Sequence, residues 1–134
     1  MEELKTITEF VQENKIRLIK CEDVAENPNI QNDDWQANHY KITLKRGYQV
    51  LTTYFSKGIA LDHGVTVEEL LDCMANDCSF SGENFNDWCD EYGYSNDSIK
   101  ALEIYKTIKR QTRQLTQFLG EKLFNNLLND VERL

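Results

Sequence analysis

At 134 residues, with 40% hydrophobic and 28% charged side chains, the chain has the length and composition of one folded globular domain. Its net charge of −8 disfavours general binding to nucleic acid or to an anionic membrane surface, because both carry dense negative charge. No apolar run approaches the ~18 residues of a membrane span. The opening MEELKTITEF also lacks the basic and then apolar stretch of a signal peptide, so we expect a cytosolic protein.

The first part of the chain predicts a helix followed by a strand. Over residues 3–14 apolar side chains recur at helical spacing, at Leu4, Ile7, Phe10 and Val11. The segment KIRLIKC, residues 15–21, alternates as a strand does, and the Pro-containing stretch after it predicts a loop. Strict alternation places Ile16 and Leu18 on one side of this strand and Arg17, Ile19 and Cys21 on the other.

Two further strands are expected to pair as an antiparallel hairpin. In HYKITLK, Tyr40, Ile42 and Leu44 face one way, and the polar residues between them face the other. Gly47 can supply the positive φ that a short connection to YQVLTTYFS requires.

The rest of the chain predicts four helices. Thr66 and Glu69 form a capping box that starts a helix reaching about residue 78. A short helix is expected over roughly 84–92, closed by Gly93, and the longest runs from a cap at Asp97 or Ser98 to residue 119. The last segment, EKLFNNLLNDVERL, is amphipathic and is expected to pack on the domain or on a partner.

This order predicts an α+β fold, with a small three-stranded antiparallel sheet preceded by one helix and covered by a C-terminal group of about four helices. We expect a single domain over 1–134. It comprises a helix with the sheet (1–64), an acidic helical region (65–95) and C-terminal helices (96–134).

The negative charge is concentrated in the middle region. Residues 1–64 hold ten acidic and eight basic side chains, residues 65–95 hold eight acidic and no basic ones, and residues 96–134 hold five acidic and seven basic ones. Residues 65–95 thus supply a charge equal to the whole net charge of −8. A region of one sign suggests a surface for a basic partner.

Seven carboxylates in this region are candidate partner-binding residues. On the short helix they are expected opposite the apolar stripe, and they are Glu83, Asp87, Asp90 and Glu91. On the preceding helix they are Glu68, Glu69 and Asp72. Between positions 83 and 91 the spacing is roughly one charge per 3 Å, close to the ~3.4 Å per charge of one DNA strand. The pattern predicts a surface that occupies a basic nucleic-acid groove on another protein.

The acidic residues have a plainer interpretation, and a second charged surface is also predicted. The acids could form a solvated face that keeps the protein soluble, although like charges at i, i+4 cost a few tenths of a kcal/mol per pair. Lys106, Lys109, Arg110 and Arg113 lie away from the apolar stripe of the long helix, where they could contact phosphate or simply face water.

The chain shows no sign of catalytic or metal chemistry. Its two histidines are His39, on a strand, and His63, beside Asp62 in a turn, and no residue stands out as a nucleophile. The cysteines, at positions 21, 73, 78 and 89, lack paired C-x₂-C spacing, so we expect reduced thiols, no metal and no cofactor.

Several segments together resemble small proteins encoded by tailed phages and prophages. They are HYKITLKRGYQVLTTYFSKG, VEELLDCMANDC, FNDWCDEYGYSNDSIKALEIY and FLGEKLFNNLLNDVERL, and the resemblance covers roughly residues 35–134, mainly through DWCDEYGYSNDS. It supplies no binding residue that can be transferred to this sequence. What it implies is a setting, because small acidic phage proteins of the host cytoplasm are often inhibitors of host defence, including anti-CRISPR proteins.

These observations lead to one leading hypothesis and one alternative. The leading hypothesis is a non-enzymatic, anti-CRISPR type inhibitor. Its acidic surface would bind a basic nucleic-acid groove of a CRISPR–Cas effector or a similar host ribonucleoprotein, with no direct DNA or RNA binding and no membrane. The alternative is a phage structural or regulatory protein that self-associates as a homodimer through its C-terminal helix.

Overall fold

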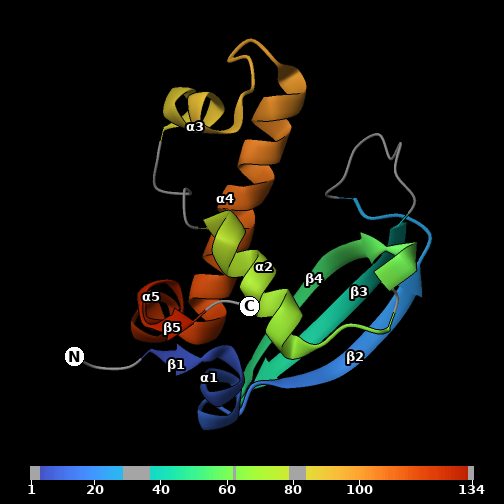
Figure 1. Cartoon of the computed structure of the whole chain (residues 1–134), viewed down its shortest axis with the longest axis vertical. Coiled ribbons are helices and arrows are strands. Elements are labelled where there is room, and N and C mark those ends of the chain that lie inside the picture. Colours follow the sequence, from blue (N-terminus) through green and yellow to red (C-terminus); the bar gives the residue numbers. More distant parts are fainter. Residues whose placement is uncertain (1–3, 29–36, 62, 79–83, 133–134) are drawn as a thin grey trace.

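The computed structural model describes residues 4–28, 37–61, 63–78 and 84–132. It confirms the predicted α+β class, with a three-stranded antiparallel sheet and a C-terminal helical group (Figure 1). The elements are β1 (Lys5–Thr6), α1 (Ile7–Glu13), β2 (Arg17–Val24), β3 (Ala37–Arg46), β4 (Gln49–Gly58), a 3₁₀ turn (Ile59–Leu61), α2 (Val67–Cys78), α3 (Phe85–Tyr92), α4 (Ile99–Leu119), α5 (Glu121–Asn129) and β5 (Val131–Glu132).

The sheet has the order β2-β3-β4 and contains the predicted hairpin. Arg46 pairs with Gln49, so the connection is two residues long, and Gly47 there has φ +59° as expected. The inner face of β3 is buried through Tyr40, Ile42 and Leu44. This face lies against α2 and α4, so the alternation read from the sequence sets which side of the sheet forms the core.

The side assignment within β2 was wrong for Cys21. A bulge at position 19 interrupts the alternation, so that Leu18 pairs with Leu44 and Cys21 pairs with Ile42, two residues of the buried face. The extra residue of a bulge moves every later side chain to the opposite face. Leu18 and Cys21 therefore share one side of β2, and both remain exposed because β2 is an edge strand.

Both ends of the described chain depart from simple helices. The first helix begins at Ile7 and not at residue 3, because Thr6 and Glu9 form a capping box. The last helix ends at Asn129, and Val131 lies in β5, which pairs in parallel with β1. The predicted apolar face of this segment is largely packed on the main core, and Leu127 is fully buried, while Leu134 lies outside the described residues.

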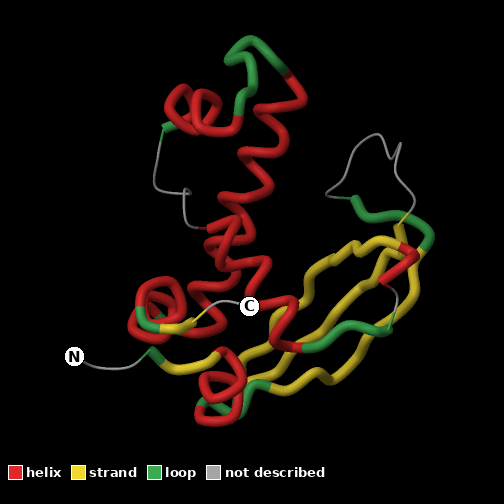
Figure 2. The backbone as a smooth tube through the Cα atoms, viewed as in Figure 1, coloured by secondary structure: helices red, strands yellow, loops and turns green. Residues whose placement is uncertain are grey.

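Two separate hydrophobic clusters hold the helices. The main core joins α1, α2, β3, β4 and α5 to the C-terminal half of α4. A satellite core around Trp88, Cys89 and Ala101 joins α3 to the N-terminal half of α4. Figure 2 shows α4 as the long helix that connects the two regions. No helix within the described ranges has the length and apolar character that a membrane span requires.

Candidate functional site

Helix α3 is anchored through an aromatic cluster, which leaves its other side exposed. Trp88 is 1% exposed and lies 5.3 Å from Tyr94 and 5.4 Å from Tyr105, between ring centroids. Asn84 accepts a hydrogen bond from the Asp87 amide, and Gly93 ends the helix with φ +75°. Both helix ends are thus satisfied locally, and the end at Gly93 was predicted from the sequence.

The exposed side of α3 carries three of the predicted carboxylates. Asp87, Asp90 and Glu91 are all exposed, and their i, i+3 and i+4 spacing places them on one face. Within the described segments, none of the three forms an ion pair with a basic side chain. Asp87 accepts a 3.0 Å hydrogen bond from the Asn84 side chain. We call these three residues the α3 acidic face; Glu83 lies outside the described residues.

Asp90 and Glu91 occupy the last turn of α3, which contains no basic residue. The C-terminal end of a helix carries partial negative charge from its unpaired carbonyl groups. A carboxylate there is unfavourable by about 0.3–1 kcal/mol near a surface. The α3 acidic face is therefore retained at a cost to helix stability.

On α2 the three predicted carboxylates are half-buried, and Glu69 is engaged within the fold. The Lys57 ammonium, from the inner face of β4, donates to Glu69 Oε2 at 2.9 Å and to the Gly64 carbonyl at 2.6 Å. Burial raises the pKa of the Glu69 carboxyl, but hydrogen bonding and charge from Lys57, with the Thr66 hydroxyl, hold this pKa below its ordinary value. Glu69 therefore has little free charge to offer a partner.

The α2 acids do not extend the α3 acidic face. Glu68 and Asp72 lie in the first half of α2, whereas α3 packs at the far end of α4 on the satellite core (Figure 1). Asp72 has interactions of its own within the fold. The structure thus divides the predicted surface into an exposed part on α3 and a half-buried part on α2.

The predicted basic face of α4 is also present. Lys106, Arg110 and Arg113 are exposed, and with Tyr105, Lys109 and Thr112 they line an open groove of about 700 Å³. The Lys109 ammonium lies 5.4 Å from the centre of the Tyr105 ring, a cation–π distance. The basic residues are therefore gathered along one side of the helix.

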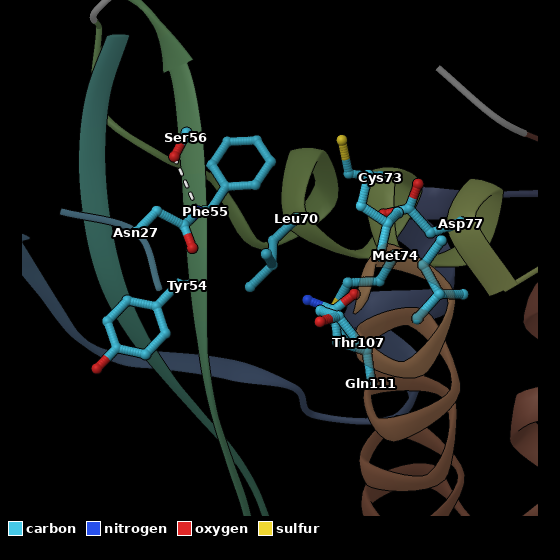
Figure 3. Close-up of a pocket in the computed structure, with 12 residues that line it drawn as sticks. Asn27, Tyr54, Phe55, Ser56, Leu70, Cys73, Met74, Asp77, Thr107 and Gln111 are labelled. Atoms are coloured by element: carbon cyan, nitrogen blue, oxygen red, sulfur yellow. Dashed lines mark hydrogen bonds between the residues drawn. The ribbon is translucent and has the colours of Figure 1, made fainter. Parts of the chain in front are cut away.

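A cavity of about 260 Å³ lies between β4, α2 and α4 and was not predicted from the sequence. Figure 3 shows Phe55 reaching from β4 toward α2, with Cys73 and Asp77 on α2 and Thr107 and Gln111 on α4. Leu70, Met74, Ile104 and Ile108 complete an apolar wall. The sequence carried no signal for it because its walls come from elements far apart in the chain.

Two titratable groups of this cavity have shifted pKa values. Desolvation raises the pKa of the Asp77 carboxyl above its ordinary value, although Asp77 as a whole is exposed. Desolvation, followed by the charges of Asp77, Asp72 and Glu69, raises the pKa of the Cys73 thiol. Because only the thiolate is strongly nucleophilic, Cys73 is poorly suited to attack a substrate at neutral pH.

The two histidines take part in small polar networks. His39 Nδ1 lies 2.6 Å from Ser56 Oγ, across the β3–β4 pairing, and Asn27 donates to the same oxygen at 2.9 Å. Asn27 and His39 thus both bond to the Ser56 hydroxyl, and the network ties Asn27 to the sheet. His63 lies 3.4 Å from the Lys57 ammonium, whereas Asp62, its neighbour in sequence, lies outside the described residues.

Metal and disulfide chemistry find no support in the described segments. No group of three or more His, Cys, Asp or Glu side chains there is placed to hold a metal ion. The four cysteines carry thiols, exposed at positions 21 and 73 and buried at positions 78 and 89.

Comparison of the chain with known protein families, with curated protein sequences and with solved structures found no match. The structure itself provides an α+β fold and, among the described residues, an acidic face on α3 and a basic face on α4.

Proposed function

We propose that this protein is a non-enzymatic inhibitor that binds a basic nucleic-acid groove on a partner through the α3 acidic face. The observation that carries the proposal is the position of Asp90 and Glu91. Both are exposed, without a basic partner in the described segments, in a helix turn where negative charge is unfavourable. A face that served solubility alone could carry the same charge at positions where it costs less stability.

The satellite core supports this proposal by holding the acids in place. Trp88 and Cys89 are buried directly beside Asp87 and Asp90 in sequence, so the backbone that carries the charges is fixed by packing. Fixed charges lose little conformational freedom on binding and can steer a basic partner toward contact. The resemblance to phage proteins favours a CRISPR–Cas effector of the host cytoplasm as that partner.

The experiment compares wild type with the neutral, nearly isosteric triple variant Asp87→Asn/Asp90→Asn/Glu91→Gln. Each is added to a panel of purified effector ribonucleoproteins, and binding of target DNA is measured. We expect wild type to block DNA binding by one effector and the variant to lose roughly a hundredfold in potency, because three charge contacts disappear.

A matched control separates the location of the charge from its amount. The variant Asp23→Asn/Glu26→Gln/Glu132→Gln changes the net charge equally, at exposed positions away from α3. It should inhibit as wild type does. Equal potency of the α3 triple variant, with its fold verified by circular dichroism, would overturn the proposal.

The groove on α4 favours a second candidate function, direct binding of nucleic acid. Its basic side chains lie along one open groove beside the ring of Tyr105. This function predicts DNA or RNA binding that weakens steeply with salt, measurable by fluorescence anisotropy. Absence of binding at low salt would remove it.

The self-association alternative receives less support, because the apolar residues of α5 are largely used inside the domain. Leu127 is fully buried, and Leu123, Phe124 and Leu128 pack against the main core. Light scattering at increasing protein concentration tests it directly.

A further inference from the structure

The cavity between β4, α2 and α4 places a carboxylate without a counter-charge beside an apolar wall. No Lys or Arg is among the described side chains that line it. Within the described segments, the Asp77 carboxylate has no hydrogen-bond donor and no ion-pair partner. Asp77 is exposed and lines the cavity, so a cation that enters the cavity can pair directly with its carboxylate.

The position of Asp77 in its helix is unfavourable as well. It lies in the last turn of α2, which contains no basic residue, next to the negative end of the helix dipole. A cation bound at Asp77 would offset this unfavourable negative charge.

The other side chains that line the cavity indicate the chemistry and the size of the ligand. Met74 and Ile108 offer apolar surface for a hydrocarbon stem, and Thr107 and Gln111 offer oxygens that can accept further N–H groups. A cavity of about 260 Å³ is smaller than the roughly 300–1,000 Å³ of typical ligand pockets, so the ligand is small.

We propose that this cavity binds a protonated alkyl amine, with its ammonium group at Asp77 and its stem against Met74 and Ile108. The site goes beyond the proposed function, since no residue of the α3 acidic face lines it. The ammonium donates to the Asp77 carboxylate and to the oxygens of Thr107 and Gln111. The same chemistry is available from a free alkyl amine and from a lysine side chain of another protein.

Methionine provides a direct probe of the site. The chain has two methionines: Met74 lines the cavity, and Met1 lies outside the described residues. In full-length protein labelled with ¹³C at the methionine methyl groups, the Met74 signal reports on the site. Titration with hexylamine is expected to shift the Met74 signal with saturation, and hexanol, which has the same stem without the charge, to bind about tenfold more weakly.

Two variants assign the effect to the carboxylate. Asp77→Asn is expected to remove the preference for hexylamine over hexanol and to leave the protein folded, because it removes an unfavourable charge. Asp23→Asn, an equal change of charge on β2, should bind hexylamine as wild type does. A saturable shift with Nα-acetyl-lysine methylamide as well would assign the site to a lysine side chain, and a shift with hexylamine alone would assign it to a free amine.

Either of two results would overturn the proposal. One is a Met74 signal that hexylamine leaves unchanged. The other is equal binding of hexylamine by wild type and Asp77→Asn, since binding would then not depend on the carboxylate. Neither result bears on the α3 acidic face, which is tested with different variants.

Discussion

At the scale of single residues, Lys57 is the clearest departure from average behaviour. Lysine side chains are mostly exposed, yet that of Lys57 is 7% exposed on the inner face of β4. It is accommodated because Glu69 and the Gly64 carbonyl accept hydrogen bonds from its ammonium. The cluster links the sheet to the start of α2, so its loss should destabilise both elements.

Replacing Lys57 by methionine tests this contribution. Lys57→Met keeps an apolar stem but leaves the half-buried Glu69 without its cation, so we expect a loss of about 1–3 kcal/mol in the free energy of unfolding. Urea denaturation followed by circular dichroism measures it. The control Lys20→Met breaks the exposed Lys20–Glu22 pair and should cost well under about 1 kcal/mol. Equal losses in the free energy of unfolding would show that the buried pair contributes no more to stability than the exposed one.

The depressed pKa of Glu69 makes a prediction about pH. Ionised Glu69 stabilises the folded state fully above its ordinary pKa of 4.5, and this contribution is lost as the pH falls through the lower folded-state pKa. Glu69→Gln should therefore be less stable than wild type at pH 7, and the difference should shrink below about pH 4.5. The free energy of unfolding measured from pH 7 to pH 3 tests this. A difference that does not change with pH would contradict it.

At the scale of elements, α3 combines well-formed ends with a poorly placed charge. Asn84 and Gly93 cap it, and the aromatic cluster holds it on α4. Asp90 and Glu91 nevertheless lie in its last turn. The stability of α3 therefore favours the loss of these two carboxylates, whereas the proposed binding function requires them.

The variant Asp90→Asn/Glu91→Gln tests the effect of these carboxylates on the stability of α3. Removing both charges should raise the free energy of unfolding of α3 by about 0.3–1 kcal/mol for each, because the helix dipole no longer opposes them. Amide hydrogen exchange of α3 measures this. Asp87→Asn, in the first turn where a carboxylate is favourable, should have the opposite sign. Stabilisation by both variants would indicate general charge repulsion in place of a dipole effect.

At the scale of the whole molecule, the two hydrophobic clusters predict two levels of stability. Among the described residues, three are fully buried in the satellite core, which is joined to the rest through α4. The main core draws on both the sheet and the helices. A small cluster attached through one helix can open without unfolding the remainder.

Truncation of one large side chain in each core tests this. Trp88→Ala should cost about 3–5 kcal/mol locally, speeding amide exchange in α3 and the first turns of α4 while the amides of β3 and β4 stay protected. Phe118→Ala, at a buried position of the main core, should speed exchange throughout. Uniform acceleration by Trp88→Ala would show one cooperative unit.

The elements were predictable because their signals are local. The capping box at Thr66, the helix end at Gly93 and the turn at Gly47 depend on residues within a few positions of each other. The exposed acids of α3 followed from the same helical spacing. The bulge at position 19 escaped prediction because one extra residue leaves no clear mark in a short alternating pattern.

The sequence by itself determined the α+β class, the pairing of β3 and β4 as a hairpin and the face of α3 that carries charge, since periodicity and capping act over about one turn or one strand pair. Only the tertiary structure decided that Glu69 is neutralised by Lys57, that Asp77 borders a cavity and that the acids of α2 and α3 lie apart. It also paired residues 5–6 with residues 131–132. All these outcomes depend on which elements, distant in the chain, come into contact in the fold. The spacing of residues along the chain does not reveal those contacts.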